Sequence, residues 1–127
     1  MTDHDLKTLI DRAWAASENA YAPYSNYQVG AALTTASGEI FAGCNVENAA
    51  YPTGLCAERT ALVKAVSEGH RQFETIVIAT RNGGSPCGMC RQMMYEFAPN
   101  LRVVCVDSHG AITLDSTLNQ LLPHGFG

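Results

Sequence analysis

Basic residues and long hydrophobic runs are both scarce in this chain. Lysine and arginine number 8 among 127 residues, against 12 aspartates and glutamates, which gives a formal net charge of −4. Proteins that bind nucleic acid usually present a basic patch, so these few, scattered cations argue against a nucleic-acid partner. No apolar run approaches the roughly 20 residues that a membrane-spanning helix needs, so no membrane partner is expected either.

The amino-terminal segment also lacks the basic and apolar regions of a signal peptide. It begins with the acidic stretch MTDHD, and we therefore expect a cytoplasmic protein. The sequence shows no internal repeat, low-complexity stretch or linker. A length of 127 residues suits one hydrophobic core, so a single domain over residues 1–127 is predicted.

Hydrophobic periodicity predicts an alternation of helices and strands. The expected helices cover about residues 6–21, 56–68, 87–97 and 116–122, and the expected strands about residues 27–35, 40–46, 75–80, 101–106 and 111–114. Thr2 is a candidate N-cap of the first helix. The hairpin is antiparallel, whereas two strand–helix–strand crossovers imply parallel pairing in part of the sheet. We therefore expect an α/β fold, a three-layer α/β/α sandwich around a mixed five-stranded sheet.

Cysteine is the residue type with an informative placement. The chain has five, and an odd number in a cytoplasmic protein argues against a disulfide framework and for metal or catalytic use. Cys44 and Cys105 lie in strand-like runs and are interpreted as buried small hydrophobic residues. The other three fall into two short motifs, LCAER around Cys56 and PCGMC around Cys87 and Cys90.

These two motifs predict an open zinc site. Three thiolates can bind a zinc ion and leave its fourth tetrahedral position for water or substrate, which is the catalytic pattern. Both motifs fall at predicted helix starts, where free N–H groups and the helix dipole favour thiolates. Glu58 lies two residues after Cys56. Because residues two apart within a helix point in different directions, both can reach one ion only if Cys56 sits at the helix boundary with non-helical geometry.

Two arginines could compensate the negative charge of this site, and two other kinds of cysteine site are alternatives. Arg59 and Arg91, each next to a cysteine, are candidates to offset the negative charge of three thiolates. A redox C-x-x-C pair is an alternative, but it leaves the first motif unexplained. A structural four-cysteine site would need Cys44 or Cys105 as the fourth ligand, and neither has a paired spacing.

With these motifs, the sequence resembles the small, tetrameric cytidine deaminases, which act on free nucleosides. Base deaminases of the zinc class carry a similar pair of motifs, with a three-cysteine variant. The resemblance covers nearly the whole chain. Its segments, in order, are YAPYSNYQVGAA (21–32), GCNVENAAY (43–51), CAERTAL (56–62), SPCGMCRQ (85–92) and LLPHGF (121–126).

The resemblance implies a cytidine deaminase-like fold and zinc-dependent hydrolytic deamination of cytidine and deoxycytidine, a reaction of pyrimidine salvage. It implies one Zn²⁺ per subunit, with Glu58 as the catalytic proton shuttle and Arg59 steadying the thiolates. The implied metal ligands are Cys56, Cys87 and Cys90. The implied substrate-binding residues are Tyr27, Asn45, Glu47, Tyr51, Ala57 and Phe126.

Individual substrate contacts also follow from the resemblance. Asn45 and Glu47 would hold the ribose hydroxyls, which suits an amide and a carboxylate that share one face of a strand. The N–H of Ala57 would bind the base carbonyl. Phe126, with Tyr51, would enter a neighbouring subunit's site, so that a homotetramer would share its active sites.

The chain departs from the family pattern at Tyr27 and in the Arg81–Ser85 loop, and two other functions are alternatives to cytidine deamination. Tyr27 stands where the family usually has phenylalanine, which adds a hydroxyl that needs a partner, and the Arg81–Ser85 loop is shorter than in some relatives. The nearest rival is a deaminase for a cytosine-containing antibiotic such as blasticidin S; the residues expected at the ribose and the Phe126 ending favour a nucleoside. A non-catalytic zinc module is the other rival, and it predicts a closed, four-ligand site.

Overall fold

The computed structural model describes residues 3–127, so the predicted cap at Thr2 lies outside the described residues. Its helices are α1 (Asp3–Ser17), α2 (Ala57–Ser67), α3 (Gly88–Phe97) and α4 (Leu118–Leu121), with a short 3-10 helix, η1 (Tyr51–Thr53). Its strands are β1 (Gly30–Thr35), β2 (Ile40–Cys44), β3 (Phe73–Ala79), β4 (Arg102–Val106) and β5 (Ile112–Thr117). The predicted order of helices and strands is confirmed.

The five strands form one mixed sheet in the order β2-β1-β3-β4-β5. β3 and β4 pair in parallel, with α3 as their crossover, and the other neighbours pair antiparallel. α2 leads from β2 to β3, which run in the same direction with β1 between them. The expected combination of an antiparallel hairpin and a parallel pair is therefore present.

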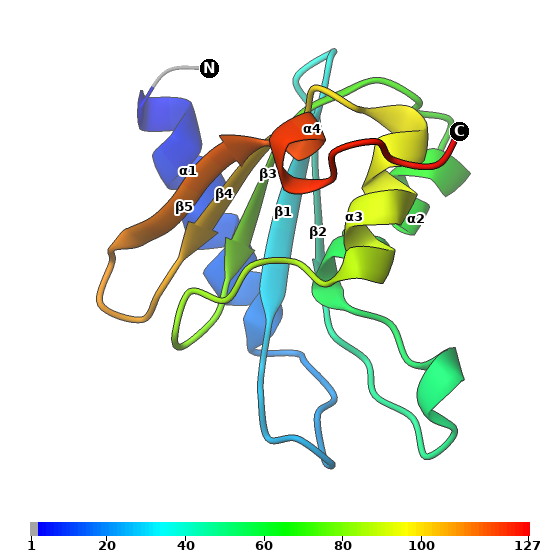
Figure 1. Cartoon of the computed structure of the whole chain (residues 1–127). Coiled ribbons are helices and arrows are strands. Elements are labelled where there is room, and N and C mark those ends of the chain that lie inside the picture. Colours follow the sequence, from blue (N-terminus) through cyan, green and yellow to red (C-terminus); the bar gives the residue numbers. More distant parts are fainter. Residues whose placement is uncertain (1–2) are drawn as a thin grey trace.

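Helices cover both faces of the sheet (Figure 1). Alternation along β3 sends Val77 and Ala79 toward the core under α1, and Ile76 and Ile78 toward the core under α2 and α3. At Gly30 a Cβ atom would lie 1.7 Å from the Ala13 carbonyl oxygen of α1. Only glycine permits this approach of helix and strand.

Several boundaries differ from the prediction. β1 begins at Gly30 rather than at residue 27, because the Asn45 side chain binds the backbone just before it. β5 extends to Thr117, since Ser116 pairs with β4, and this shortens the last helix.

The carboxyl ends of three strands and the starts of two helices lie at the same end of the sheet. β2, β3 and β4 finish there, and α2 and α3 begin there, at the bottom of Figure 1. Ligands of α/β sheets commonly bind beyond the carboxyl ends of strands. Among residues 3–127, no helix is long and apolar enough to cross a membrane.

Candidate active site

Three cysteine sulfurs meet where α2 and α3 begin. Cys56 is the N-cap of α2, with φ −72° and ψ 156°, and Cys87 is the N-cap of α3, with φ −69° and ψ 169°. Cys90 is the third residue of α3. The prediction that Cys56 lies at a helix boundary with non-helical geometry is confirmed, and both N-caps place sulfur at the positive end of a helix dipole.

The sulfur spacing fits one zinc ion. The Sγ atoms of Cys56 and Cys87 are 3.9 Å apart, those of Cys87 and Cys90 are 3.3 Å apart, and all three lie within 4.8 Å of one another. Tetrahedral zinc with bonds of about 2.3 Å places its sulfur ligands about 3.8 Å apart. Within residues 3–127 the cluster includes neither Cys44 nor Cys105, so the four-cysteine alternative finds no support.

The cluster already favours a thiolate. A hydrogen bond from the Cys90 thiol, aided by Arg59, lowers the pKa of Cys56 to about 5. The same contact with Cys56 raises the pKa of Cys90. Arg59 Nη2 lies 3.8 Å from Cys56 Sγ and donates to the Gly54 carbonyl at 3.2 Å. Metal binding to such a group displaces the remaining thiol protons.

Glu58 is the second residue of α2 and is only 4% exposed. Its burial raises the pKa of its carboxyl group above the usual value. Glu58 lines the same cavity as Cys56 and Cys87. A buried carboxyl group with a raised pKa beside a metal site is a candidate for moving protons near neutral pH.

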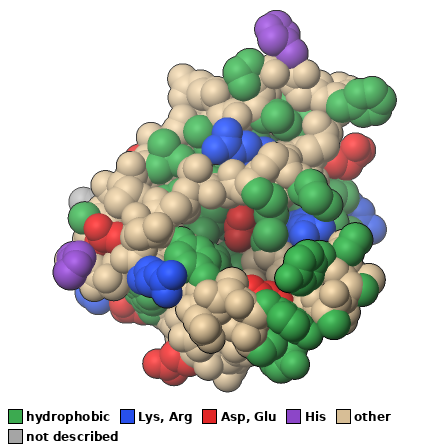
Figure 2. Space-filling model, turned by 60° about the horizontal axis from the view of Figure 1, so that its bottom comes forward, with side chains coloured by type: hydrophobic (Ala, Val, Ile, Leu, Met, Phe, Trp, Pro, Cys, Tyr) green, Lys and Arg blue, Asp and Glu red, His purple; other side chains and the backbone are tan. Residues whose placement is uncertain are grey.

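That cavity has a volume of 760 Å³, within the range of small-molecule sites. Cys56, Cys87 and Glu58 line it together with Ala57, the first residue of α2, whose N–H has no partner within its own helix. Tyr27, Asn45 and Glu47 line it as well. Figure 2 views this end of the molecule, where hydrophobic side chains gather around a hollow in which an acidic side chain is visible.

Asn45 is 8% exposed and serves the backbone as well as the cavity. Its Oδ1 accepts from the Val29 N–H at 2.9 Å, and its Nδ2 donates to the Tyr27 carbonyl at 2.8 Å. Nδ2 has a second hydrogen and Oδ1 a second lone pair, so a ligand can still bind this amide. The pocket wall is therefore built by the same side chain that is predicted to touch the sugar.

Glu47 lies beyond the end of β2, yet it also lines the cavity. Its Oε1 accepts from the N–H groups of Tyr24 (3.0 Å) and Ser25 (3.1 Å), and its Oε2 accepts from the Ser25 hydroxyl. The Ser25 hydroxyl is the main cause that lowers the pKa of Glu47. Glu47 is therefore held as a carboxylate.

Two predicted substrate contacts are largely exposed. Tyr51 is 76% exposed at the cavity rim, with its ring edge-on to Tyr24 at 6.3 Å between centroids. Phe126 is 85% exposed and does not line the cavity of its own chain. Gln92 fixes the Phe126 backbone, donating to its carbonyl at 2.9 Å and accepting from its N–H at 3.1 Å.

Comparison with known proteins agrees with this geometry. The family described as the cytidine and deoxycytidylate deaminase zinc-binding region matches residues 3–106. The chain belongs to this family. A cytidine deaminase from Halalkalibacterium halodurans is 45% identical over 96% of the chain and 94% of that protein. A probable cytidine deaminase from Dictyostelium discoideum is 44% identical over 97% of the chain and 84% of that protein.

Solved structures of this family share the fold. The cytidine deaminase from Burkholderia pseudomallei matches with a TM-score of 0.91 and 47% identity, covering 99% of this chain and 100% of that one. The enzyme from Mycobacterium tuberculosis matches with a TM-score of 0.85 and 32% identity, covering 100% and 99%. The resemblance read from the sequence and the three-layer α/β fold are both confirmed.

Some residues play parts in this site that the sequence did not reveal. Arg91, expected to offset thiolate charge, donates to the Pro86 and Leu121 carbonyls at 2.8 and 2.7 Å, so its contacts secure the backbone. For Ser25, which binds Glu47, the sequence offers only its place in the family segment 21–32 as a signal. For Gln92, the only signal is its place in the segment 85–92.

Proposed function

We propose that the chain catalyses zinc-dependent hydrolytic deamination of cytidine and deoxycytidine to uridine and deoxyuridine, with release of ammonia. The observation that carries this proposal is a cluster of three cysteine sulfurs beside a cavity that Cys56, Cys87 and the buried Glu58 line. Family membership and relatives named as cytidine deaminases support it. The proposal treats residues 1–127 as one cytoplasmic catalytic domain that acts on free nucleosides, with no nucleic acid or membrane as partner.

The zinc ion and Glu58 would have different roles in the reaction. Cys56, Cys87 and Cys90 would hold the zinc ion, which acts as a Lewis acid that makes water a nucleophile at neutral pH. Glu58 takes a proton from the attacking water on a carboxylate oxygen and delivers it to the ring nitrogen. Glu58 then takes the second proton from the newly attached hydroxyl and passes it to the amine. The C–N bond breaks as the C=O bond forms, so that one water is consumed and one ammonia leaves. The hydrogen bond from Cys90, together with Arg59, favours the charged form of the Cys56 sulfur.

Other residues that line the cavity would hold the nucleoside. Asn45 and Glu47 can together donate to and accept from the sugar hydroxyls, and the N–H of Ala57, which has no partner within α2, suits the base carbonyl. Tyr27 lines the same cavity. The contacts that already fix Asn45 and Glu47 reduce the conformational freedom that substrate binding would otherwise remove.

A homotetramer with shared sites is part of the proposal. Phe126 is exposed with its backbone clamped, which suits insertion into the site of another subunit. Tyr51 is exposed at the rim of the cavity, where such a neighbour would arrive. Sedimentation is expected to show a tetramer; an active monomer would contradict the shared-site part.

Assays of the purified protein test the substrate class. Cytidine, deoxycytidine, adenosine and blasticidin S are supplied separately, and ammonia is measured together with the product. We expect ammonia and uridine or deoxyuridine in equal amounts from the first two substrates only. Turnover of blasticidin S alone would favour the antibiotic deaminase, and no ammonia from any of the four would favour a non-catalytic zinc protein.

A further inference from the structure

The hydroxyl of Tyr27 has a partner on the loop that leads to the metal site. It donates to Oδ1 of Asn82, which also accepts from the Thr80 hydroxyl at 3.3 Å. Thr80 in turn accepts from the Gly84 N–H at 2.9 Å. A Cβ on Gly84 would lie 3.1 Å from the Tyr27 hydroxyl oxygen, so the loop backbone runs close to this ring. The loop that follows β3 is therefore tied to Tyr27 and continues to Cys87.

The face of the Tyr27 ring is also occupied. The guanidinium carbon of Arg81 lies 4.9 Å from the ring centroid, a cation–π distance. Arg81 Nη1 also donates to the carbonyl of Asn26, the residue before Tyr27, at 3.3 Å. Two neighbouring loop residues, Arg81 and Asn82, thus hold one aromatic side chain from its face and its tip.

The backbone of Tyr27 is bonded to the residues proposed to hold the sugar. Its N–H donates to the Ser25 hydroxyl at 3.0 Å, and that hydroxyl also binds Glu47. Its carbonyl accepts from Asn45 at 2.8 Å. Tyr27 therefore joins the residues proposed to hold the sugar to the loop that precedes the metal-site helix.

We propose that the contact between the Tyr27 hydroxyl and Asn82 is a latch that joins the residues proposed to hold the sugar to the loop before the metal-site helix, with Asn82 as a positioning residue for nucleoside binding. Asn82 does not line the cavity, whereas Tyr27 does, so Asn82 acts through the Tyr27 ring. The Tyr27 hydroxyl, which the phenylalanine usual at this position lacks, thus binds Asn82 rather than the sugar. The inference rests on the proposed deamination of cytidine.

Steady-state kinetics with cytidine test the latch in Tyr27→Phe, Asn82→Leu and the double variant, each checked for zinc content. We expect each single variant to raise KM about two- to tenfold, the loss of one hydrogen bond, with kcat within about twofold. The double variant should raise KM no further than the larger single effect. Asn82→Asp keeps the acceptor oxygen and should retain the wild-type KM.

Asn100→Leu is the matched control, because Asn100 Oδ1 accepts from Asn119 at 2.9 Å outside the cavity. Its KM should not change. A raised KM in Tyr27→Phe with a normal KM in Asn82→Leu would show that the hydroxyl serves the substrate, and unchanged KM in both would remove the latch. Multiplicative effects in the double variant would also overturn it.

Unfolding free energies of the same proteins separate the latch from the proposed function. Tyr27→Phe and Asn82→Leu should show non-additive losses of stability if the two side chains interact, whatever the protein's substrate. A wild-type protein without activity on cytidine would overturn the proposed function and the KM effect. Additive losses of stability, in contrast, would overturn the latch itself.

Discussion

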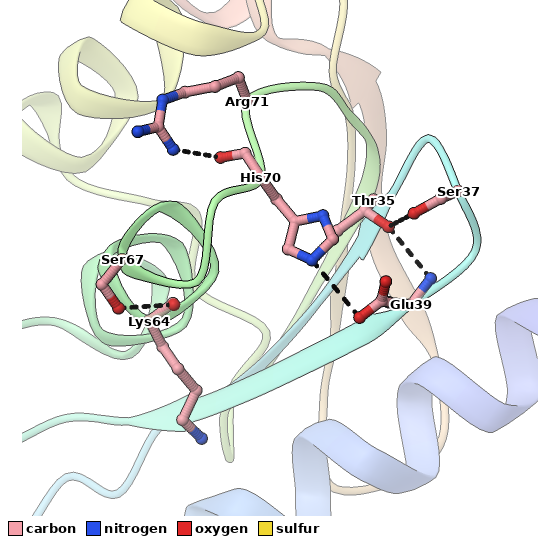
Figure 3. Close-up of polar contacts among 7 residues, drawn as sticks. All are labelled: Thr35, Ser37, Glu39, Lys64, Ser67, His70 and Arg71. Atoms are coloured by element: carbon pink, nitrogen blue, oxygen red, sulfur yellow. Dashed lines mark hydrogen bonds and ion pairs between the residues drawn. The ribbon is translucent and has the colours of Figure 1, made fainter.

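The two ends of strands β1 and β3 both carry a cavity with polar residues, but they differ in what those residues bind. The site end, where β3 finishes, holds the cysteine cluster and the 760 Å³ cavity. The turn end, where β1 finishes, holds a cavity of 310 Å³ beside Thr35, Ser37, His70 and Arg71 (Figure 3). The contacts at the turn end stabilise the turn, whereas the donor atoms at the site end form a group that could hold a metal ion.

Polar groups at the turn end bind one another. The Thr35 hydroxyl lies 2.9 Å from the Ser37 hydroxyl and accepts from the Glu39 N–H at 3.0 Å, while His70 Nε2 lies 3.4 Å from a Glu39 oxygen. Arg71 donates to the carbonyls of His70 and Val66 (Figure 3 shows the first of these). These contacts close local turns, so a hollow with polar lining does not by itself indicate chemistry.

At the site end three sulfurs converge, Arg59 lies 3.8 Å from one of them, and Glu58 contributes a buried carboxyl group to the same site. Such a group of thiols is suited to a metal ion rather than to closing a turn. The donor set therefore distinguishes the two ends more sharply than cavity size does.

Removal of one sulfur should have the largest effect. Cys90→Ser replaces a soft ligand of the cluster and should abolish both zinc binding and cytidine turnover. Cys44→Ala is the matched control, because Cys44 lies outside the cluster, and it should keep zinc and turnover. Zinc and ammonia release are measured on the same samples; a zinc-loaded, active Cys90→Ser protein would refute the ligand assignment.

A smaller effect is expected at the wall proposed to hold the sugar. Glu47→Gln removes a carboxylate that would make charge-assisted hydrogen bonds, so KM for cytidine should rise about 10- to 100-fold while zinc is retained. Glu39→Gln makes the same change at the turn end and should leave KM unchanged. Equal KM values for the two variants would remove the functional distinction between the two ends.

Stability should respond only weakly at the turn end. The Glu39 side chain is 59% exposed in its contact with His70, and such exposed pairs contribute less than about 1 kcal/mol. Glu39→Gln should therefore lower the free energy of unfolding by less than about 1 kcal/mol. Chemical denaturation measures this, and a loss of several kcal/mol would show that the turn end is more than a turn.

The smallest effect is a pH dependence at the edge strand. Arg102 donates to both carboxylate oxygens of Asp115, at 3.0 and 2.7 Å, and this lowers the pKa of Asp115. Its stabilisation is therefore present above the unfolded pKa of about 3.9 and is lost as pH falls through the lower folded pKa. Asp115→Asn should cost less than about 1 kcal/mol at neutral pH.

Denaturation curves at neutral pH and near pH 3 measure this dependence. The difference in unfolding free energy between wild type and Asp115→Asn should shrink at the lower pH, because the wild-type carboxylate becomes protonated. A difference that grows on acidification would contradict the sign derived from the Arg102 pair.

The metal site could be predicted from sequence because its rules are local. A cysteine at a helix start, such as Cys56, follows from motif spacing and from the direction of side chains on a helix. Contacts between distant segments could not be predicted in this way. The Asn45 bonds to the backbone near Tyr27, and the partner of the Tyr27 hydroxyl on Asn82, depend on how separate loops meet after the sheet forms.

The predicted start of β1 at residue 27 was wrong for a related reason. Residues 27–29 have strand-like composition, but the Asn45 side chain takes the hydrogen bonds of the Val29 N–H and the Tyr27 carbonyl. Arg91 follows a cysteine in sequence, yet carbonyl groups at the start of α3 and near the carboxyl terminus occupy its guanidinium. The sequence motifs therefore located the metal site, but closeness in sequence did not show which arginine contacts a cysteine sulfur.

The most direct measurement determines zinc content and uridine formation in Glu58→Gln, beside the wild type. Glutamine keeps the size of this buried side chain but cannot carry the proton. We expect one zinc per subunit in both proteins and a loss of turnover of about 10²–10⁴-fold in the variant. A zinc-loaded variant that forms uridine at the wild-type rate would contradict the central role of Glu58.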